Sequence, residues 1–234
     1  VQIMGIDIGP IEITEGLAIS FDAGNTRSYS GSGTSVIGLV GGIGVTLING
    51  VGFGTTGTNY FILDGTNDNI PFYVPNVGTT LTIELWAKVR SFNGGMIFGF
   101  SLYDVWTQNG AMGFNTAQAD QYGLTSTQVN NLGLLNQWKH YVFEMRSDVS
   151  YTNNKIYING QSQTLSQNGG NENASNRNFN SGLGKISGWL ADGNYHQAMD
   201  VALFRVYNRA LSSGEVLQNY NALSKRFNYL ENIV

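Results

Sequence analysis

The chain has 234 residues, no cysteine and only two histidines, His140 and His196. The absence of cysteine excludes a disulfide scaffold, a thiol nucleophile and any zinc–cysteine site. Two histidines without cysteine do not make a strong zinc constellation. A single domain of this length buries enough surface to be stable without a metal or a disulfide.

Charge is also scarce, because charged residues make up 12% of the chain and the net charge is −4. Binding to nucleic-acid phosphates requires clustered lysine and arginine, so we expect no nucleic-acid partner. No apolar run reaches the length of a membrane helix, and we expect no membrane insertion. The N-terminus has no basic stretch followed by an apolar one, so we expect no secretory signal.

Proline is rare, with 3 residues, whereas glycine is abundant, with 31. Many glycines fit a fold with many turns. Residues 81–90 alternate between apolar and mostly polar side chains, which predicts a strand with one face in a core. Further strands are predicted at residues 17–22, 60–64, 96–100, 138–145, 155–158 and 201–207, the fifth ending in an Asn-Gly hairpin turn. Residues 29–57 and 161–182 are expected to be a surface excursion with short ladders and a surface loop.

The last quarter of the chain combines a strand with a helix. Ser212 can cap a helix start, and Glu215 can reach back to it. Val216, Tyr220, Leu223 and Phe227 then fall on roughly one helical face. We therefore expect one β-sandwich domain over residues 17–234 that is locked by the strand at 201–207. Residues 1–16, which Pro10 interrupts, are expected to be an edge strand or an arm that pairs with a neighbouring subunit.

Five segments, in this order, resemble the laminin-G-like, concanavalin A-like lectin/glucanase superfamily. They are Phe61-Ile62-Leu63-Asp64-Gly65, Leu81-Thr82-Ile83-Glu84-Leu85-Trp86, Trp138-Lys139-His140-Tyr141-Val142, Lys155-Ile156-Tyr157-Ile158-Asn159-Gly160 and Phe204-Arg205-Val206-Tyr207-Asn208. The likeness covers roughly residues 17–211. It implies an all-β, concanavalin A-like jelly-roll sandwich of two antiparallel sheets, here with a short C-terminal helix. Residues 21–25 and 219–227 are similar to copies carried in bacteriophage, including cyanophage, virion proteins.

The resemblance implies no cofactor other than calcium. Family members often carry an aspartate near the start of the last strand, where this chain has Ala202. A calcium ion needs six to eight oxygen ligands. The available carboxylates are Asp22, Asp64, Asp68 and Asp200. The resemblance also gives His140, which follows the family's Trp-x-His pattern, a structural hydrogen-bonding role.

Catalysis is not expected. A glycan hydrolase needs two carboxylates across the scissile bond, and laminarinase-type relatives place theirs in a Glu-x-Asp-x-x-Glu run that this chain lacks. Glu84 and Glu144 are expected to be single exposed strand carboxylates. The chain is therefore predicted not to be an enzyme.

Two stretches combine aromatic side chains with amides or carboxylates, which is the composition of a carbohydrate site. Both are expected to lie on loops, where binding residues concentrate. The candidate carbohydrate-binding residues are Tyr103, Trp106, Asn109, Trp189, Asp192, Asn194 and Tyr195. Two alternatives remain open, because Trp106 and Trp189 would serve equally as caps of the sandwich ends or as contacts to a neighbouring protein.

The hypothesis that follows is a non-enzymatic protein of the virion surface, as a capsid decoration, tail or fibre component. Its partners would be other virion proteins, including copies of itself, with the N-terminal arm or the C-terminal helix as anchor. The alternative is a lectin-type module that recognises a glycan of the host surface. A glycan hydrolase is the third and weakest hypothesis.

Overall fold

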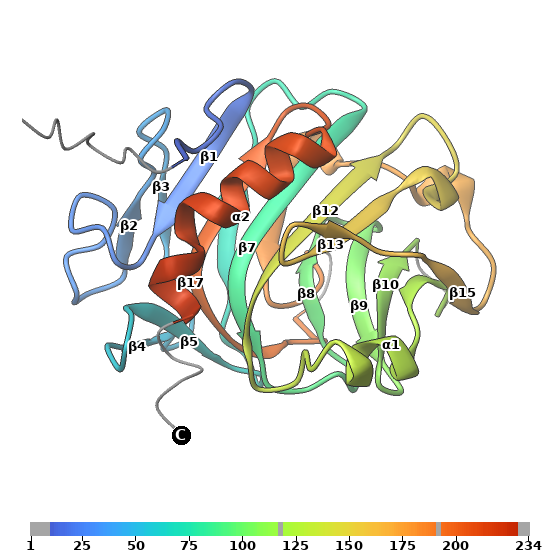
Figure 1. Cartoon of the computed structure of the whole chain (residues 1–234), viewed down its shortest axis with the longest axis horizontal. Coiled ribbons are helices and arrows are strands. Elements are labelled where there is room, and N and C mark those ends of the chain that lie inside the picture. The colour runs from blue at the N-terminus through green and yellow to red at the C-terminus, as the bar shows by residue number, and fades with distance from the viewer. Residues whose placement is uncertain (1–9, 117–118, 191–192, 229–234) are drawn as a thin grey trace, which may run out of the picture.

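The computed structural model describes residues 10–116, 119–190 and 193–228. Within these residues the chain forms two antiparallel sheets of eight and seven strands, here called sheet 1 and sheet 2, and a separate two-stranded hairpin. The two sheets pack face to face, and one long helix lies across the outer face of sheet 1 (Figure 1). The predicted sandwich with a C-terminal helix is confirmed.

Sheet 1 has the order β14, β13, β12, β7, β17, β5 and β4, with β1 paired to β17. Its strands are β1 (Leu17–Asp22), β4 (Gly52–Gly54), β5 (Tyr60–Asp64), β7 (Thr80–Val89), β12 (Trp138–Arg146), β13 (Lys155–Ile158), β14 (Gln161–Ser162) and β17 (Ala198–Tyr207). Sheet 2 has the order β15, β11, β10, β9, β8, β16 and β6. Its strands are β6 (Ile70–Tyr73), β8 (Met96–Gly99), β9 (Asp104–Gln108), β10 (Ala111–Asn115), β11 (Gln121–Leu124), β15 (Ser166–Gly169) and β16 (Leu183–Ile186).

The remaining elements are short, apart from one helix. They are the hairpin strands β2 (Ser35–Ile37) and β3 (Gly44–Thr46), the helices α1 (Ser126–Asn131) and α2 (Ser213–Asn228), and the 3-10 turns η1 (Tyr151–Asn153), η2 (Ala174–Asn176) and η3 (Asn180–Gly182). The short ladders predicted within residues 29–57 are present as β2, β3 and β4. Among the described residues, no helix has the length and apolar character that crossing a membrane requires.

Strand β17 closes sheet 1. It pairs with β7 along one side, and on the other side it pairs first with β5 and then with β1. It begins at Ala198 rather than at Val201, and nearly all of its side chains are buried. The prediction that this last strand locks the sandwich is confirmed, because three strands from distant parts of the chain meet on it.

Both faces of β7 are covered. One face contributes Leu81, Ile83 and Leu85 to the core between the sheets. The other face, expected to be solvated, packs against α2, whose Phe227 ring stacks on Trp86 at 4.1 Å between ring centroids and 7° between planes. The helix therefore covers the outer face of sheet 1 around Trp86.

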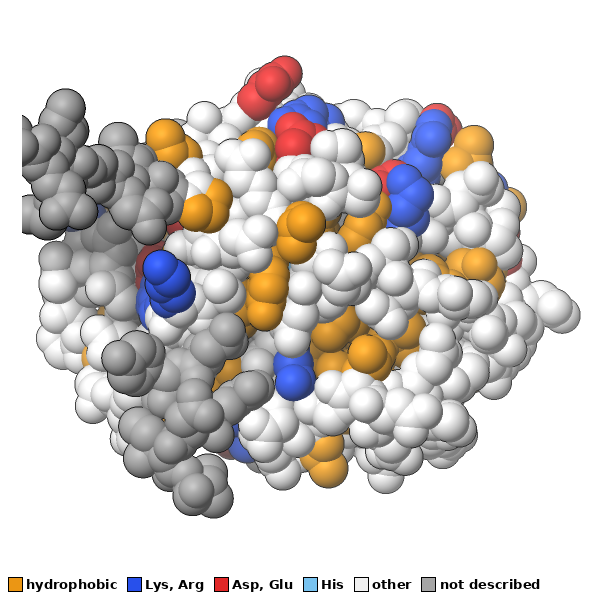
Figure 2. Space-filling model, viewed as in Figure 1, with side chains coloured by type: hydrophobic (Ala, Val, Ile, Leu, Met, Phe, Trp, Pro, Cys, Tyr) orange, Lys and Arg blue, Asp and Glu red, His pale blue; other side chains and the backbone are white. Residues whose placement is uncertain are grey.

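Helix α2 begins as the sequence predicts. The Ser212 backbone N–H donates to Glu215 Oε2 at 2.8 Å, and the Glu215 N–H donates to Ser212 Oγ at 3.3 Å. The side chains of Val216 and Phe227 are buried, with Tyr220 and Leu223 partly buried beside them. Figure 2 views the molecule from the helix side, where charged side chains are few and hydrophobic side chains are exposed in the middle of the face.

Two loop predictions are wrong. Residues 104–108, expected on a loop, form β9 in sheet 2, joined to β10 by a turn in which Asn109 and Gly110 both have positive φ. Residues 161–182, expected to be a surface loop, contain β15, which pairs with β11. Strands β9 and β15 have only 5 and 4 residues, so their strand character depends on partners elsewhere in the chain.

Residues 10–16 form no strand and lie against β17 and α2. Glu12 pairs with Arg205 at 2.6 Å, and the Ile13 N–H donates to Asn219 Oδ1 at 2.8 Å. The Tyr207 hydroxyl oxygen lies 3.0 Å from the Ile13 carbonyl oxygen. This part of the expected arm therefore packs on its own domain, while residues 1–9 lie outside the described residues.

Candidate functional site

A pocket of about 340 Å³ lies beside β8, β9 and β10 of sheet 2, and is called the aromatic pocket. Its described lining residues are Met96, Leu102, Asp104, Trp106, Asn115, Ala119, Trp189 and Tyr195. Three of the predicted carbohydrate-binding residues, Trp106, Trp189 and Tyr195, meet here although they lie up to 89 positions apart, as the residue numbers 106 and 195 show.

The alternation of β9 places the pocket residues on the outer face of sheet 2. Val105 belongs to the core, so Asp104 and Trp106 on either side of it point away from the core. Across the pairing with β10, Trp106 faces Gly113 and Asp104 faces Asn115. Position 113 has no room for a side chain, because a Cβ there would lie 2.6 Å from the Tyr122 carbonyl oxygen and 2.9 Å from the Gln121 side chain.

The Tyr195 ring packs against the other two aromatic rings of the pocket. The Tyr195 ring is 6.3 Å from the Trp106 ring at 83°, and 6.2 Å from the Trp189 ring at 57°. Trp106 is 8% exposed, whereas Tyr195 is 43% exposed. The Trp189 indole N–H donates to the Ser101 carbonyl, which fixes that ring. Trp106 therefore forms the floor and Tyr195 the exposed wall.

The polar part of the floor is an aspartate–asparagine pair. Both Asp104 oxygens accept from Asn115 Nδ2, at 3.0 and 3.1 Å. Burial raises the pKa of the Asp104 carboxyl well above its usual range, and the charge of Asp120 acts in the same direction against the Asn115 hydrogen bond. Within the described part of the chain, the Trp106 indole N–H and Asn115 Oδ1 have no hydrogen-bond partner.

A second cavity of about 520 Å³, the polar pocket, adjoins the first. Its described lining is Asp64, Gly65, Thr66, Ser91, Asn93, Gly94, Gly95, Asn194, Tyr195, His196, Gln197 and Ala198. Tyr195 lines both pockets, and Asn194 lines this one. The two cavities therefore have a common aromatic wall.

The remaining predicted carbohydrate-binding residues lie elsewhere. Tyr103 is fully buried in the core, where its hydroxyl donates to the Arg146 carbonyl at 3.0 Å and accepts from Asn154 Nδ2. A ring without exposed surface has no face for a sugar, so including Tyr103 was wrong. Asn109 lies in the β9–β10 turn and does not line either of the two pockets described above. Asp192 lies outside the described residues.

Sequence reasoning missed Asp104, Asn115, Met96 and Leu102. Asp104 belongs to one of the aromatic stretches that the sequence predicts as loops. In a strand over residues 104–108, period two places Asp104 and Trp106 on one face. No local signal identifies Asn115, since it joins Asp104 only through the β9–β10 pairing.

The four aspartates proposed for calcium do not assemble. Asp22 is paired with Arg226 at 2.8 Å, and Asp200 with Lys88 at 2.7 Å and with Arg90. Asp64 accepts from the N–H of Thr66 within its own turn, and the Asp64 N–H donates to buried Asp68. No cluster of three or more histidine or carboxylate ligands is suited to a metal in the part of the chain that the structure describes. The calcium prediction for this set is wrong, because arginine and lysine already neutralise two of its members.

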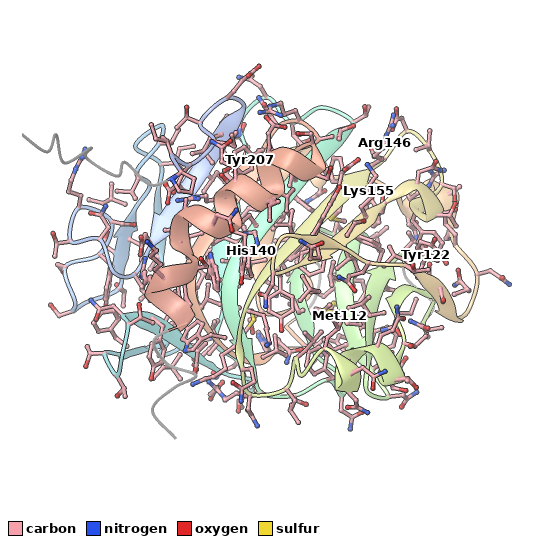
Figure 3. All side chains as sticks on the ribbon, viewed as in Figure 1. Met112, Tyr122, His140, Arg146, Lys155 and Tyr207 are labelled. Carbon is pink, nitrogen blue, oxygen red and sulfur yellow. The ribbon has the colours of Figure 1, made fainter. Side chains whose placement is uncertain are left out.

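The two strand glutamates are also placed differently from the prediction. Glu84 is fully buried beneath α2, with His140 Nε2 at 3.0 Å and Asn219 Nδ2 at 2.8 Å from its oxygens. Figure 3 shows His140 and Tyr207 close to this helix. Glu144 is mostly buried and pairs with Lys155 at 3.1 Å. The expectation of exposed carboxylates was wrong, whereas the structural hydrogen-bonding role of His140 is confirmed.

Comparison with known proteins gives a family match over most of the chain. The family model described as the concanavalin A-like lectin/glucanases superfamily, of laminin-G type, matches residues 64–217. A search of curated proteins found no match.

Solved structures share the fold at low sequence identity. The receptor-binding domain of a botulinum neurotoxin C/D mosaic serotype has 14% identity and a TM-score of 0.58, over 88% of this chain and 51% of that chain. The receptor-binding domain of botulinum neurotoxin D has 14% identity and a TM-score of 0.57, over 88% and 52%. A Trypanosoma rangeli sialidase in complex with 2,3-difluorosialic acid has 15% identity and a TM-score of 0.62, over 93% and 35%. The chain thus spans about half of the toxin domains and about a third of the sialidase.

Proposed function

We propose that this chain, which belongs to the concanavalin A-like lectin/glucanase superfamily, is a non-enzymatic module that binds a carbohydrate in its aromatic pocket. The observation that carries the proposal is the meeting of Trp106, Trp189 and Tyr195 over the Asp104–Asn115 pair. Aromatic rings pack on the apolar faces of sugars, and a few polar groups orient the hydroxyls. The pocket volume of about 340 Å³ falls within the usual range of small-molecule sites.

The carboxylates support binding rather than hydrolysis. Glycoside hydrolysis uses two carboxyl groups on opposite sides of the scissile bond. Asp104 is the one carboxyl group among the described residues that line the aromatic pocket, and it is held by Asn115. Glu84 is enclosed between sheet 1 and α2, on the other side of the sandwich. We therefore expect no turnover of a bound glycan.

The setting that we propose for this module is the surface of a virion, as a capsid decoration, tail or fibre component. Its partners there would be other virion proteins and, through the pocket, a glycan of the host surface. The proposal rests on the resemblance, expected from the sequence, of residues 21–25 and 219–227 to copies in bacteriophage virion proteins, and on the low share of charged residues, 12% of the chain. Mass spectrometry of purified particles tests it, and the absence of the protein from them would contradict it.

A glycan array of the full chain tests the carbohydrate proposal. We expect binding to a limited set of glycans that falls at least tenfold in Trp106→Ala and in Trp189→Ala, because each change removes a ring of the pocket. Tyr73→Ala is the matched control, since Tyr73 is an exposed aromatic residue of sheet 2 that lines neither pocket. Circular dichroism establishes that each variant is folded.

A blank array for the wild-type chain would overturn the proposal. Binding that persists in both tryptophan variants would place the site elsewhere. Release of new reducing ends from a bound glycan would contradict the non-enzymatic part.

A further inference from the structure

The common wall of the two pockets points to the size of the ligand. We infer that the ligand is a neutral oligosaccharide of two or more sugar units, which lies across Tyr195 and occupies both the aromatic and the polar pocket. This inference rests on the proposed function and extends it to a ligand class. A single sugar seated in the aromatic pocket would leave the larger polar pocket empty.

Tyr195 is held in place between the pockets. Its φ is +64°, a left-handed conformation that is uncommon for a bulky residue and is often found where a site constrains the backbone. The Met96 N–H donates to the Tyr195 carbonyl at 2.8 Å. The ring is nevertheless 43% exposed. A fixed backbone with an exposed ring suits a platform over which a sugar chain passes.

The histidine after Tyr195 secures the same loop. His196 Nε2 is 2.8 Å from the Gly193 carbonyl, and Nδ1 is 3.2 Å from the Asp68 carbonyl. His196 also forms a bridge to Met96 of β8. The exposed ring is therefore tied at its backbone to sheet 2 and to the turn that precedes β6.

The two pockets offer different contacts, ring stacking in one and hydrogen bonds in the other, which suits two successive sugar units. The aromatic pocket offers ring faces for stacking. The polar pocket offers hydroxyl and amide groups from Thr66, Ser91 and Asn93, and Tyr195 is the one phenylalanine, tyrosine or tryptophan in its described lining. A first unit would stack in the aromatic pocket, and the next would form mainly hydrogen bonds.

The charges favour a neutral ligand over an anionic one. The described linings include the carboxyl groups of Asp64 and Asp104 but no lysine or arginine. Hydrogen bonds, chiefly from the Thr66 N–H, lower the pKa of exposed Asp64, so this carboxylate is charged at neutral pH. A negative charge at the polar pocket disfavours an acidic sugar by like-charge repulsion.

Titration calorimetry with length series tests the inference. The probes are malto-, cello-, laminari- and chito-oligosaccharides of one to six units, with the length series of any further glycan that the array selects and sialyllactose as the anionic probe. We expect the affinity for the bound series to rise at least tenfold between one and three units and then to level off. We expect sialyllactose to bind no more tightly than lactose.

Substitutions in each pocket separate the contributions of the two pockets to the binding affinity. The double variant Thr66→Ala, Asn93→Ala should weaken the trisaccharide three- to tenfold and leave the single sugar unchanged. Tyr195→Ala should weaken both, whereas Tyr195→Phe should bind like the wild type because it keeps the ring. Asn221→Ala is the matched control, since Asn221 is an exposed amide of α2 on the opposite face.

The outcomes separate the inference from the proposed function. Affinity that is independent of chain length, with no effect of the Thr66 and Asn93 changes, would overturn the inference while Trp106-dependent binding preserved the proposed function. Tighter binding of sialyllactose than of lactose would overturn the neutral ligand class. Failure of every glycan on the panel and the array would overturn both.

Discussion

Glu84 is a carboxylate with no exposed surface, surrounded by hydrogen-bond donors. His140, Tyr207 and Asn219 contact its oxygens at 3.0, 3.3 and 2.8 Å, and the guanidinium of Arg205 lies at 3.6 Å. Burial alone would raise the pKa of Glu84, but Arg205 and the hydrogen bonds outweigh burial and lower it. The charged form is therefore the one that the fold requires.

Removing this charge should destabilise the protein strongly. We expect Glu84→Gln to lower the free energy of unfolding at pH 7 by about 3 kcal/mol, because the buried Arg205 charge loses one carboxylate partner and keeps Glu12. Glu144→Gln is the matched control, since its partner Lys155 is half exposed, and should cost only about 0–1 kcal/mol. Urea unfolding measures both, and equal costs would contradict the assigned role of the cluster.

The pH dependence has a defined sign. Because the pKa of Glu84 is lower in the folded chain, its contribution is present above the unfolded value of about 4.3 and is lost as the pH falls through the folded value. Glu84→Gln should therefore lose less stability than the wild type on acidification through this window. If the variant and the wild type lost the same stability on acidification, the lowered pKa of Glu84 would be contradicted.

For single residues, the sequence predicted the hydrogen-bonding role of a side chain better than its burial. The role of His140 was predicted, but the burial of Glu84 was not, because its cover consists of residues of α2 more than a hundred positions later. Tyr103 and Trp106 lie three residues apart and look alike in the sequence. Strand β9 begins between them, and the structure places Tyr103 in the core and Trp106 at the pocket.

Helix α2 is the element that differs most from a plain two-sheet sandwich. Phe227 and Tyr220 both stack on Trp86, and Trp138 lies 5.5 Å from the Phe227 ring. Arg226 adds an ion pair with Asp22 of β1 at 2.8 Å. The helix therefore binds its sheet through an aromatic contact that is reinforced at its last turn.

Truncating the central ring of this contact should loosen the helix. We expect Phe227→Ala to lower the free energy of unfolding by about 3–5 kcal/mol, as for other buried aromatic side chains. Leu217→Ala is the control on the same helix, because Leu217 is 38% exposed, and should cost about 0.5 kcal/mol. Urea unfolding followed by tryptophan fluorescence measures both costs, and similar costs would contradict the packing described for α2.

Elements with strong local signals were predictable from the sequence. The capping residues and the four apolar positions gave α2, and period two gave β7 and β12. Strand β9 was missed because Asp104-Val105-Trp106-Thr107-Gln108 is short and buried on both sides, so its sequence lacks clear alternation. Strand β15 was missed because its residues, Ser166–Gly169, are all polar or glycine.

At the scale of the whole molecule, the topology makes folding depend on residues near the end of the chain. Strand β17 provides pairing partners for β1, β5 and β7, so sheet 1 is incomplete until residues 198–207 are in place. Such long-range pairing is typical of β-sandwiches and slows folding to milliseconds or seconds.

The fold class was predictable because several strand signals agreed in family order, whereas the pocket depended on pairings across the chain.

Two truncations test this dependence. A chain that ends at residue 197 lacks β17 and α2, and we expect it to show no cooperative unfolding transition. A chain that ends at residue 211 keeps β17, and we expect a cooperative but weaker transition together with increased binding of a hydrophobic dye over the exposed Trp86 face. Cooperative unfolding of the shorter chain would contradict the central place of β17.

Helix α2 covers the outer face of sheet 1, whereas the aromatic pocket lies on the outer face of sheet 2. The molecule therefore has one closed side, under the helix, and one side that is open to a ligand. Copies grouped through their closed sides would all direct their pockets outward. Several weak contacts made at once to a dense sugar coat raise the total strength of attachment by about 10²–10⁴ without any change in the individual site. For the proposed glycan ligand, the stacking of α2 on sheet 1 and of sheet 1 on sheet 2 would leave the sheet 2 side free to make several such contacts at once.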